Sequence, residues 1–222
     1  MKNFLSVVVS IAFFSLASSA NAAFMVEVYS SDVGVGSLEV AQSVIDKATG
    51  PDYQAMTDVI DFTDDKDQGG HFNVDYSFGL DDPLDTFVFY AKTLINVEKG
   101  GYYTIGTNSD DGVKVSINGD AKIVNGTPHD NMDNFYTDYF LAGLYDVEIL
   151  FYEDWGGASI ELFAAEGKHH NFHSSSAHFQ LIGSDPKAAS IYSTAAVPEP
   201  ATMLLFGTGI ACLAGVARKR KK

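Results

Sequence analysis

Two stretches of the chain alternate apolar and polar residues, and this alternation constrains the fold more than any other feature. Residues 113–117 place Val113, Val115 and Ile117 on one side, and residues 145–151 repeat the pattern. A period of two is typical of a β-strand with one buried face. The pair Asn118-Gly119 follows the first stretch and is a strong signal for a two-residue hairpin. We therefore predict an all-β fold, an antiparallel β-sandwich or barrel.

The predicted domain covers residues 23–183. Its one expected helix runs over 37–48, where Leu38, Ala41 and Ile45 share a face and Ser37 is a plausible N-cap. Residues 108–112 (Asn-Ser-Asp-Asp-Gly) form a predicted turn, and residues 184–196 are predicted to be a linker.

The N-terminus has the order of a secretory signal peptide. A short start with Lys2 precedes an apolar run from Phe4 to Leu16, and small residues end in Ala20-Asn21-Ala22. This order predicts a signal peptide over 1–22, cleaved by signal peptidase after Ala22. The alternative is an uncleaved anchor, for which the apolar run is short.

The C-terminus has a second three-part order over residues 197–222. Val197-Pro198-Glu199-Pro200 precedes an uncharged apolar segment over 201–217, and five basic residues close the chain over 218–222. The apolar segment is at the lower limit for a membrane span, and the basic cluster favours a cytoplasmic end.

The charge of the chain limits its partners. It carries 29 acidic and 14 basic side chains, a formal net charge of −15, and six of the basic residues lie in the two end segments. Such an acidic body repels the phosphates of nucleic acid and favours cations, above all calcium. The single cysteine, Cys212, lies in the C-terminal apolar segment, so a cysteine-based zinc site is excluded.

The C-terminal segment resembles the PEP-CTERM sorting signal of Gram-negative bacteria, on the residues Pro198, Glu199 and Pro200, the glycine-containing apolar segment and the basic end. The resemblance implies sorting by an exosortase-type membrane protease, transient anchoring through 201–217, and a place at the cell surface or in an exopolysaccharide biofilm matrix. A permanent single-span anchor is the alternative.

The central region resembles the protective-antigen-type (PA-fourteen) domain. The run from Gly101 to Gly119, the segment LAGLYDVEI over 141–149 and the segment YEDWGGA over 152–158 carry the resemblance. It implies an antiparallel β-sandwich that serves as a carbohydrate-binding module. In one branch of the family two consecutive aspartates hold a calcium ion that also binds sugar hydroxyls, and Asp110 and Asp111 match that pair.

A second ligand loop of that family precedes a Trp-Gly, which Trp155-Gly156 matches, but its asparagine is missing here. Glu153 or Asp154 could take its place. For Asp110 and Asp111 the alternative is a turn whose side chains bond local amides. Trp155 could stack on a sugar ring, or it could pack in the core or at an edge. The acidic segments 64–67, 81–82 and 130–133 could each bind calcium loosely, but none matches an EF-hand loop, and they are interpreted as solvated surface.

The predicted function is an exported glycan- or exopolysaccharide-binding module, with calcium as a possible cofactor and no catalytic residues. The sequence has no Gly-x-Ser-x-Gly, His-Glu-x-x-His or phosphate-binding loop. Two alternatives remain: a structural matrix protein without a specific ligand, and a polysaccharide hydrolase.

Overall fold

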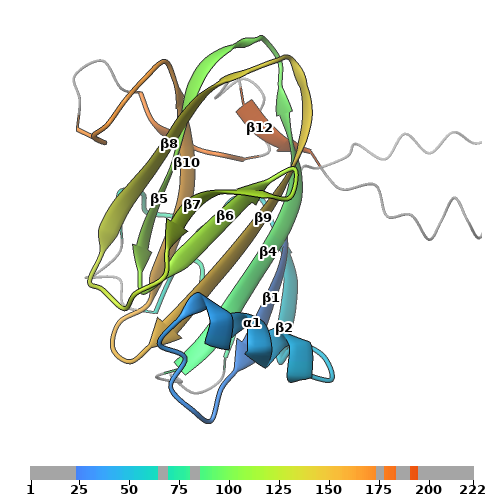
Figure 1. Ribbon diagram of the computed structural model, residues 1–222, viewed down its shortest axis with the longest axis vertical. Helices are drawn as coiled ribbons and strands as arrows, with labels where there is room; N and C mark the ends of the chain where they lie inside the picture. The colour runs from blue at the N-terminus through green and yellow to red at the C-terminus, as the bar shows by residue number, and fades with distance from the viewer. Residues whose placement is uncertain (1–23, 65–69, 81–85, 174–177, 184–190, 195–222) are drawn as a thin grey trace, which may run out of the picture.

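Two antiparallel β-sheets pack face to face in the computed structural model, which describes residues 24–64, 70–80, 86–173, 178–183 and 191–194 (Figure 1). The larger sheet has the order β2-β1-β4-β9-β6-β7, and β12 also pairs with β4. The smaller sheet has the order β11-β10-β5-β8, and β3 also pairs with β10. The antiparallel β-sandwich predicted from the sequence is confirmed.

In chain order, the strands are β1 (Phe24–Ser30), β2 (Tyr53–Thr57), β3 (Asp61–Thr63), β4 (Thr86–Val97), β5 (Gly101–Asp110), β6 (Val113–Ile117), β7 (Asp120–Asn125), β8 (Met132–Phe140), β9 (Gly143–Asp154), β10 (Ser159–Glu166), β11 (Gln180–Leu181) and β12 (Ile191–Thr194).

The core lies between the sheets and is built by the predicted alternation. Val113, Val115 and Ile117 of β6 are buried there, together with Val147, Ile149 and Phe151 of β9. Facing residues of β10 and β5 complete it from the smaller sheet. Burial of this apolar surface is the main favourable term that holds the sheets together.

The helix α1 (Leu38–Lys47) lies against the larger sheet, near the start of β4 and the end of β9 (Figure 1). The Ser37 side chain accepts a hydrogen bond from the Val40 amide, which confirms the predicted N-cap. The helix covers Leu150 and Tyr152, which point away from the core and would otherwise expose a large apolar surface.

One predicted turn is confirmed and another is wrong in extent. Asn118 and Gly119 have φ of 51° and 81°, as a two-residue hairpin between β6 and β7 requires. Residues 108–110, in contrast, continue β5, because all three pair with β10, and Asn108 and Ser109 also pair with β8. The chain then crosses at Asp111-Gly112 to β6 in the larger sheet, so this segment is a corner between sheets.

The domain extends further than residue 183. Residues 191–194 were predicted to belong to the linker, but they form β12, which pairs with Leu94–Val97 of β4 and buries Ile191. The predicted signal peptide over 1–22 and the sorting signal over 197–222, with its apolar segment 201–217, lie outside the described residues. Within the described ranges, no helix has the length and apolar character needed to cross a membrane.

Gly112 gives a test of the corner. A methyl group there would collide with the ring of Tyr152, which is fully buried and whose hydroxyl donates to the Gly126 carbonyl. Gly112→Ala is therefore expected to lower the free energy of unfolding by about 1–3 kcal/mol, measured by urea denaturation.

Gly50→Ala is the matched control, because no atom lies within 4 Å of its added methyl group. It is expected to change stability by less than about 0.5 kcal/mol. Equal losses for the two variants would contradict the packing argument.

Candidate functional site

Three carboxylates from the two sheets meet at one end of the sandwich. Asp110 is the last residue of β5, Asp111 lies in the corner, and Glu153 is near the end of β9. One oxygen from each lies within 4.8 Å of the other two. The peptide bond that joins Asp110 and Asp111 is cis. We call Asp110, Asp111 and Glu153 the carboxylate cluster.

Asp111 is fixed by both of its oxygens. Oδ1 accepts a hydrogen bond from the His129 amide at 2.7 Å, and Oδ2 accepts one from the Asp154 amide at 2.9 Å. Asp111 is buried, so these bonds form away from solvent. They join the corner to the loop before β8 and to the end of β9.

Asp110 has a pKa that is raised to about 6, first by burial and then by the negative charges of Asp111 and Asp130. Within the described part of the chain, its carboxylate has no hydrogen-bond donor. The fold therefore places a carboxylate where its charged form is disfavoured.

Glu153 is more strongly affected, because its side chain has no exposed surface. Oε1 accepts from the Trp155 amide at 3.1 Å, while Oε2 is buried with no hydrogen-bond partner. Its pKa is raised to about 9, first by burial and then by the charges of Asp111 and Asp110. A buried oxygen without a partner is costly unless a proton or a cation satisfies it.

The structure separates the two residues that the sequence offered for the second ligand loop. Glu153 joins the carboxylate cluster. Asp154 turns its carboxylate to the loop before α1, where it accepts from the Val35 amide at 2.6 Å, and only its backbone amide faces Asp111.

Trp155 lies on the surface beside this cluster. Its side chain is 68% exposed, and both Trp155 and Gly156 have positive φ, 119° and 114°. The alternative that Trp155 packs in the core is therefore wrong. Its side chain is accessible just after the end of β9, and its backbone amide donates to the Glu153 carboxylate.

Three neighbours of the cluster were not assigned to this site by the sequence. Asp64 and Asp130 raise the pKa of Asp110, and His129 opposes that shift. Asp64 also accepts from the Ala158 amide at 2.8 Å. The sequence placed Asp64 and Asp130 on solvated loops, because only long-range strand pairing brings those loops to the end of β5.

Comparison with known proteins identifies the family to which this fold belongs. The family model of the PA14 domain matches residues 42–170, more than half of the chain. The chain belongs to the PA14 domain family. A second family model, the PEP-CTERM protein-sorting motif, matches residues 196–221, which contain Pro198, Glu199 and Pro200. Among curated proteins, none matches the chain.

Solved structures show the same PA14 fold at low sequence identity. The PA14 sugar-binding domain from an RTX adhesin is 14% identical with a TM-score of 0.57, and the match covers 79% of this chain and 99% of that one. The PA14 domain of the antifreeze protein MpAFP is 12% identical with a TM-score of 0.55, covering 77% and 89%. An anti-sigma factor domain-containing protein is 18% identical with a TM-score of 0.50, covering 73% and 46%.

The carboxylate cluster of this PA14 domain offers oxygen ligands of the kind that calcium prefers. Backbone amides already hold two of its carboxylates in place: the amides of His129 and Asp154 donate to Asp111, and the amide of Trp155 donates to Glu153. The partnerless Glu153 Oε2 is the strongest sign that the residues fit a cation, because an ion would satisfy an oxygen that the protein leaves unpaired.

The raised pKa values predict how stability depends on pH in a chelator. A carboxyl whose pKa is higher in the folded state holds its proton longer there than in the unfolded chain. The thermal midpoint is therefore expected to fall as pH rises from about 4.5 through the folded-state pKa of about 9 for Glu153.

Glu161, with a pKa raised to about 7, contributes to the lower part of this range. Glu153→Gln is expected to remove the slope between about pH 7 and 9 and to reduce the slope at lower pH to the contributions of Glu161 and Asp110. Scanning calorimetry with chelator measures both. A midpoint that rises over that upper interval would contradict the burial argument.

Proposed function

We propose that this PA14 protein is an exported carbohydrate-binding module of the cell surface or biofilm matrix, and that it binds glycans through calcium at the carboxylate cluster. The observation that carries the proposal is the convergence of three carboxylates within 4.8 Å, one of which has a buried oxygen without a partner.

Asp110, Asp111 and Glu153 are the residues that would hold the ion. When bound, calcium supplies positive charge that offsets these carboxylates and open coordination positions for sugar hydroxyls. Each oxygen of Asp111 accepts one hydrogen bond from a backbone amide and keeps a lone pair for an ion. Asp110 has no donor of its own within the described residues, so its oxygens are available.

The loop over 152–157 would shape specificity. Trp155 presents an exposed aromatic face beside the cluster, and Gly156 and Gly157 leave space next to it. An aromatic face gains contact area with the C–H side of a pyranose ring, while its edges leave the hydroxyls to polar groups. Asp154 would support this loop through its bond to Val35.

Two kinds of likeness support the proposal. The structurally similar domain from an RTX adhesin is described as sugar-binding. The PEP-CTERM motif supports export, and we propose signal peptidase cleavage after Ala22 and recognition of Pro198, Glu199 and Pro200 by an exosortase-type protease of a Gram-negative bacterium. Residues 201–217 would anchor the chain transiently during that step. No catalytic role is proposed.

Calcium and glycan binding are tested together on the full-length chain in a detergent without sugar groups. Calcium is expected to raise the thermal midpoint by mass action, and an oligosaccharide array is expected to show binding that chelator abolishes. Asp110→Asn is expected to remove both responses. Asp120→Asn, at the exposed β6–β7 turn, is the control and is expected to keep both.

A flat midpoint in calcium, or array binding that persists in Asp110→Asn, would overturn the calcium mechanism. Retention in the matrix without binding to any glycan would favour the structural matrix protein. Release of reducing ends from exopolysaccharide would favour the hydrolase.

The two aspartates are expected to differ in stability. Asp111→Asn removes a buried charged acceptor from two amides and is expected to cost about 1–3 kcal/mol with or without calcium. Asp110→Asn removes a charge that faces Asp111 and makes no hydrogen bond, so in chelator at neutral pH it is expected to stabilise the fold. Urea denaturation with and without calcium separates the two, and equal effects would contradict the assigned roles.

A further inference from the structure

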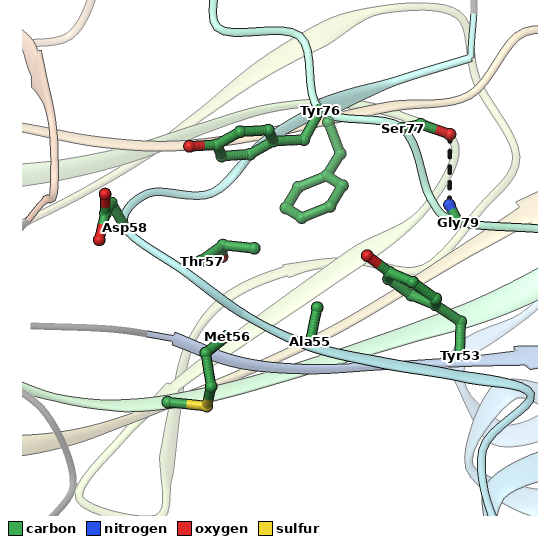
Figure 2. Close-up of a pocket in the computed structure, with 9 residues that line it drawn as sticks. Tyr53, Ala55, Met56, Thr57, Asp58, Tyr76, Ser77 and Gly79 are labelled. Carbon is green, nitrogen blue, oxygen red and sulfur yellow. Dashed lines mark hydrogen bonds between the residues drawn. The ribbon is translucent and has the colours of Figure 1, made fainter.

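A pocket lies at the open edge of the sandwich, between β2 of the larger sheet and the segment that follows β3 of the smaller sheet. Its volume is about 410 Å³, which is in the range of roughly 300–1,000 Å³ found for small-molecule sites. Figure 2 shows Tyr53, Ala55 and Thr57 of β2 on one side of this space and Tyr76 on the other. We call it the edge pocket.

The edge pocket has an aromatic lining. Phe62, which is 1% exposed and belongs to the core, packs against Tyr76 with ring centroids 5.5 Å apart. Tyr53 and Tyr76 are half-buried and pack against the same core. The lining therefore combines a rigid apolar base with two rings that reach toward solvent.

Gly79 fixes one of these rings. Its φ is +77°, and a Cβ added there would lie 2.5 Å from the ring of Tyr53, so the loop backbone passes directly over that ring. The Ser77 hydroxyl accepts a hydrogen bond from the Gly79 amide at 3.2 Å and holds the loop in this path. A ring that is already positioned loses less conformational entropy when a ligand binds.

The rim of the edge pocket is polar. Within the described residues, the hydroxyls of Tyr53 and Tyr76 make no hydrogen bond, although half-buried tyrosine hydroxyls usually find a partner. The exposed carboxylate of Asp58 lines the pocket and also makes no hydrogen bond among those residues. The Thr57 hydroxyl, by contrast, is already engaged with the Val59 carbonyl.

We propose that the edge pocket is a second glycan subsite, which binds one pyranose ring of a neutral sugar without a metal ion. Two aromatic rings suit the C–H faces of a sugar, and three polar groups without partners suit its hydroxyls. An anionic ligand is disfavoured, because Asp58 is the charged residue of the lining and the chain is acidic overall. A fully apolar ligand would leave the two hydroxyls and the carboxylate desolvated and unpaired.

The subsite shares no residue with the carboxylate cluster, but it lies close enough to act with it. Phe62 is on β3, and the neighbouring residue Thr63 pairs with Ser159 of β10, which pairs in turn with Asp110 of β5. Two strand spacings separate β3 from β5, a distance of about 10 Å. An extended oligosaccharide that binds at both places would gain affinity from the linkage.

The test uses the full-length chain in a detergent without sugar groups and with chelator present, so that binding at the carboxylate cluster cannot contribute. The probes are methyl β-glucoside, methyl β-galactoside and methyl α-mannoside, and binding is measured by saturation-transfer NMR and by ring-proton shifts of labelled tyrosine. At least one glycoside is expected to bind in chelator and to shift the Tyr53 and Tyr76 signals.

Tyr53→Leu is expected to weaken this binding by about tenfold or more, as loss of an aromatic anchor does. Tyr53→Phe and Asp58→Asn remove one polar group each and are expected to weaken it by about threefold to tenfold; they decide the matter if Tyr53→Leu does not fold. Tyr139→Leu, which removes an exposed tyrosine of β8, is the control and is expected to bind unchanged.

Absence of binding by all three glycosides in chelator would overturn the subsite, as would equal binding by the Tyr53 variants and the control. A hydrophobic dye that binds the edge pocket while the glycosides do not would also overturn it. Asp110→Asn is expected to keep the chelator-resistant binding, so failure of the calcium site and failure of this subsite give different results.

Discussion

The hydrogen bonds of one buried carboxylate, Asp111, organise the end of the sandwich that holds the carboxylate cluster. Its two oxygens accept hydrogen bonds from backbone amides that lie 18 and 43 residues further along the chain. These amides belong to the loop before β8 and to the end of β9. Because the chain changes sheets at this residue, the same bonds fix the crossing and bring Glu153 to Asp110. The fold thereby gathers like charges that would repel one another, and the proposed calcium site rests on this unfavourable arrangement.

Several other acidic residues of this chain also act inside the fold, so its negative charge is more than a surface property. Glu161 accepts from the amides of His71 and Phe72, and Asp61 accepts from the Val74 amide. Strand pairing places both in one row across the smaller sheet with Asn108 and Asp133. Carboxylates thus hold irregular segments against the sheet, because each can satisfy two backbone amides that no strand partner reaches.

The sequence was sufficient where structure depends on neighbours in the chain, and insufficient where it depends on distant pairing. The alternation in 113–117, the hairpin at Asn118-Gly119 and the cap at Ser37 are local and were predicted correctly. The extent of β5 and the existence of β12 follow from partners more than 20 residues away, which no local pattern identifies. The choice between Glu153 and Asp154 was, however, encoded: Phe151 faces the core, so alternation along β9 turns Glu153 inward and Asp154 outward.

The place of β12 on the larger sheet determines how this domain is presented. Thr194 pairs with Leu94 of β4, whereas the carboxylate cluster lies at the end where Thr86 of the same strand pairs with Asp154. Eight residues of a strand extend about 27 Å, and the four steps from Thr194 to Pro198 add at most about 14 Å of reach. A membrane or an enzyme that held the chain at Pro198 would therefore hold the domain at the end of β4 that is remote from the carboxylate cluster.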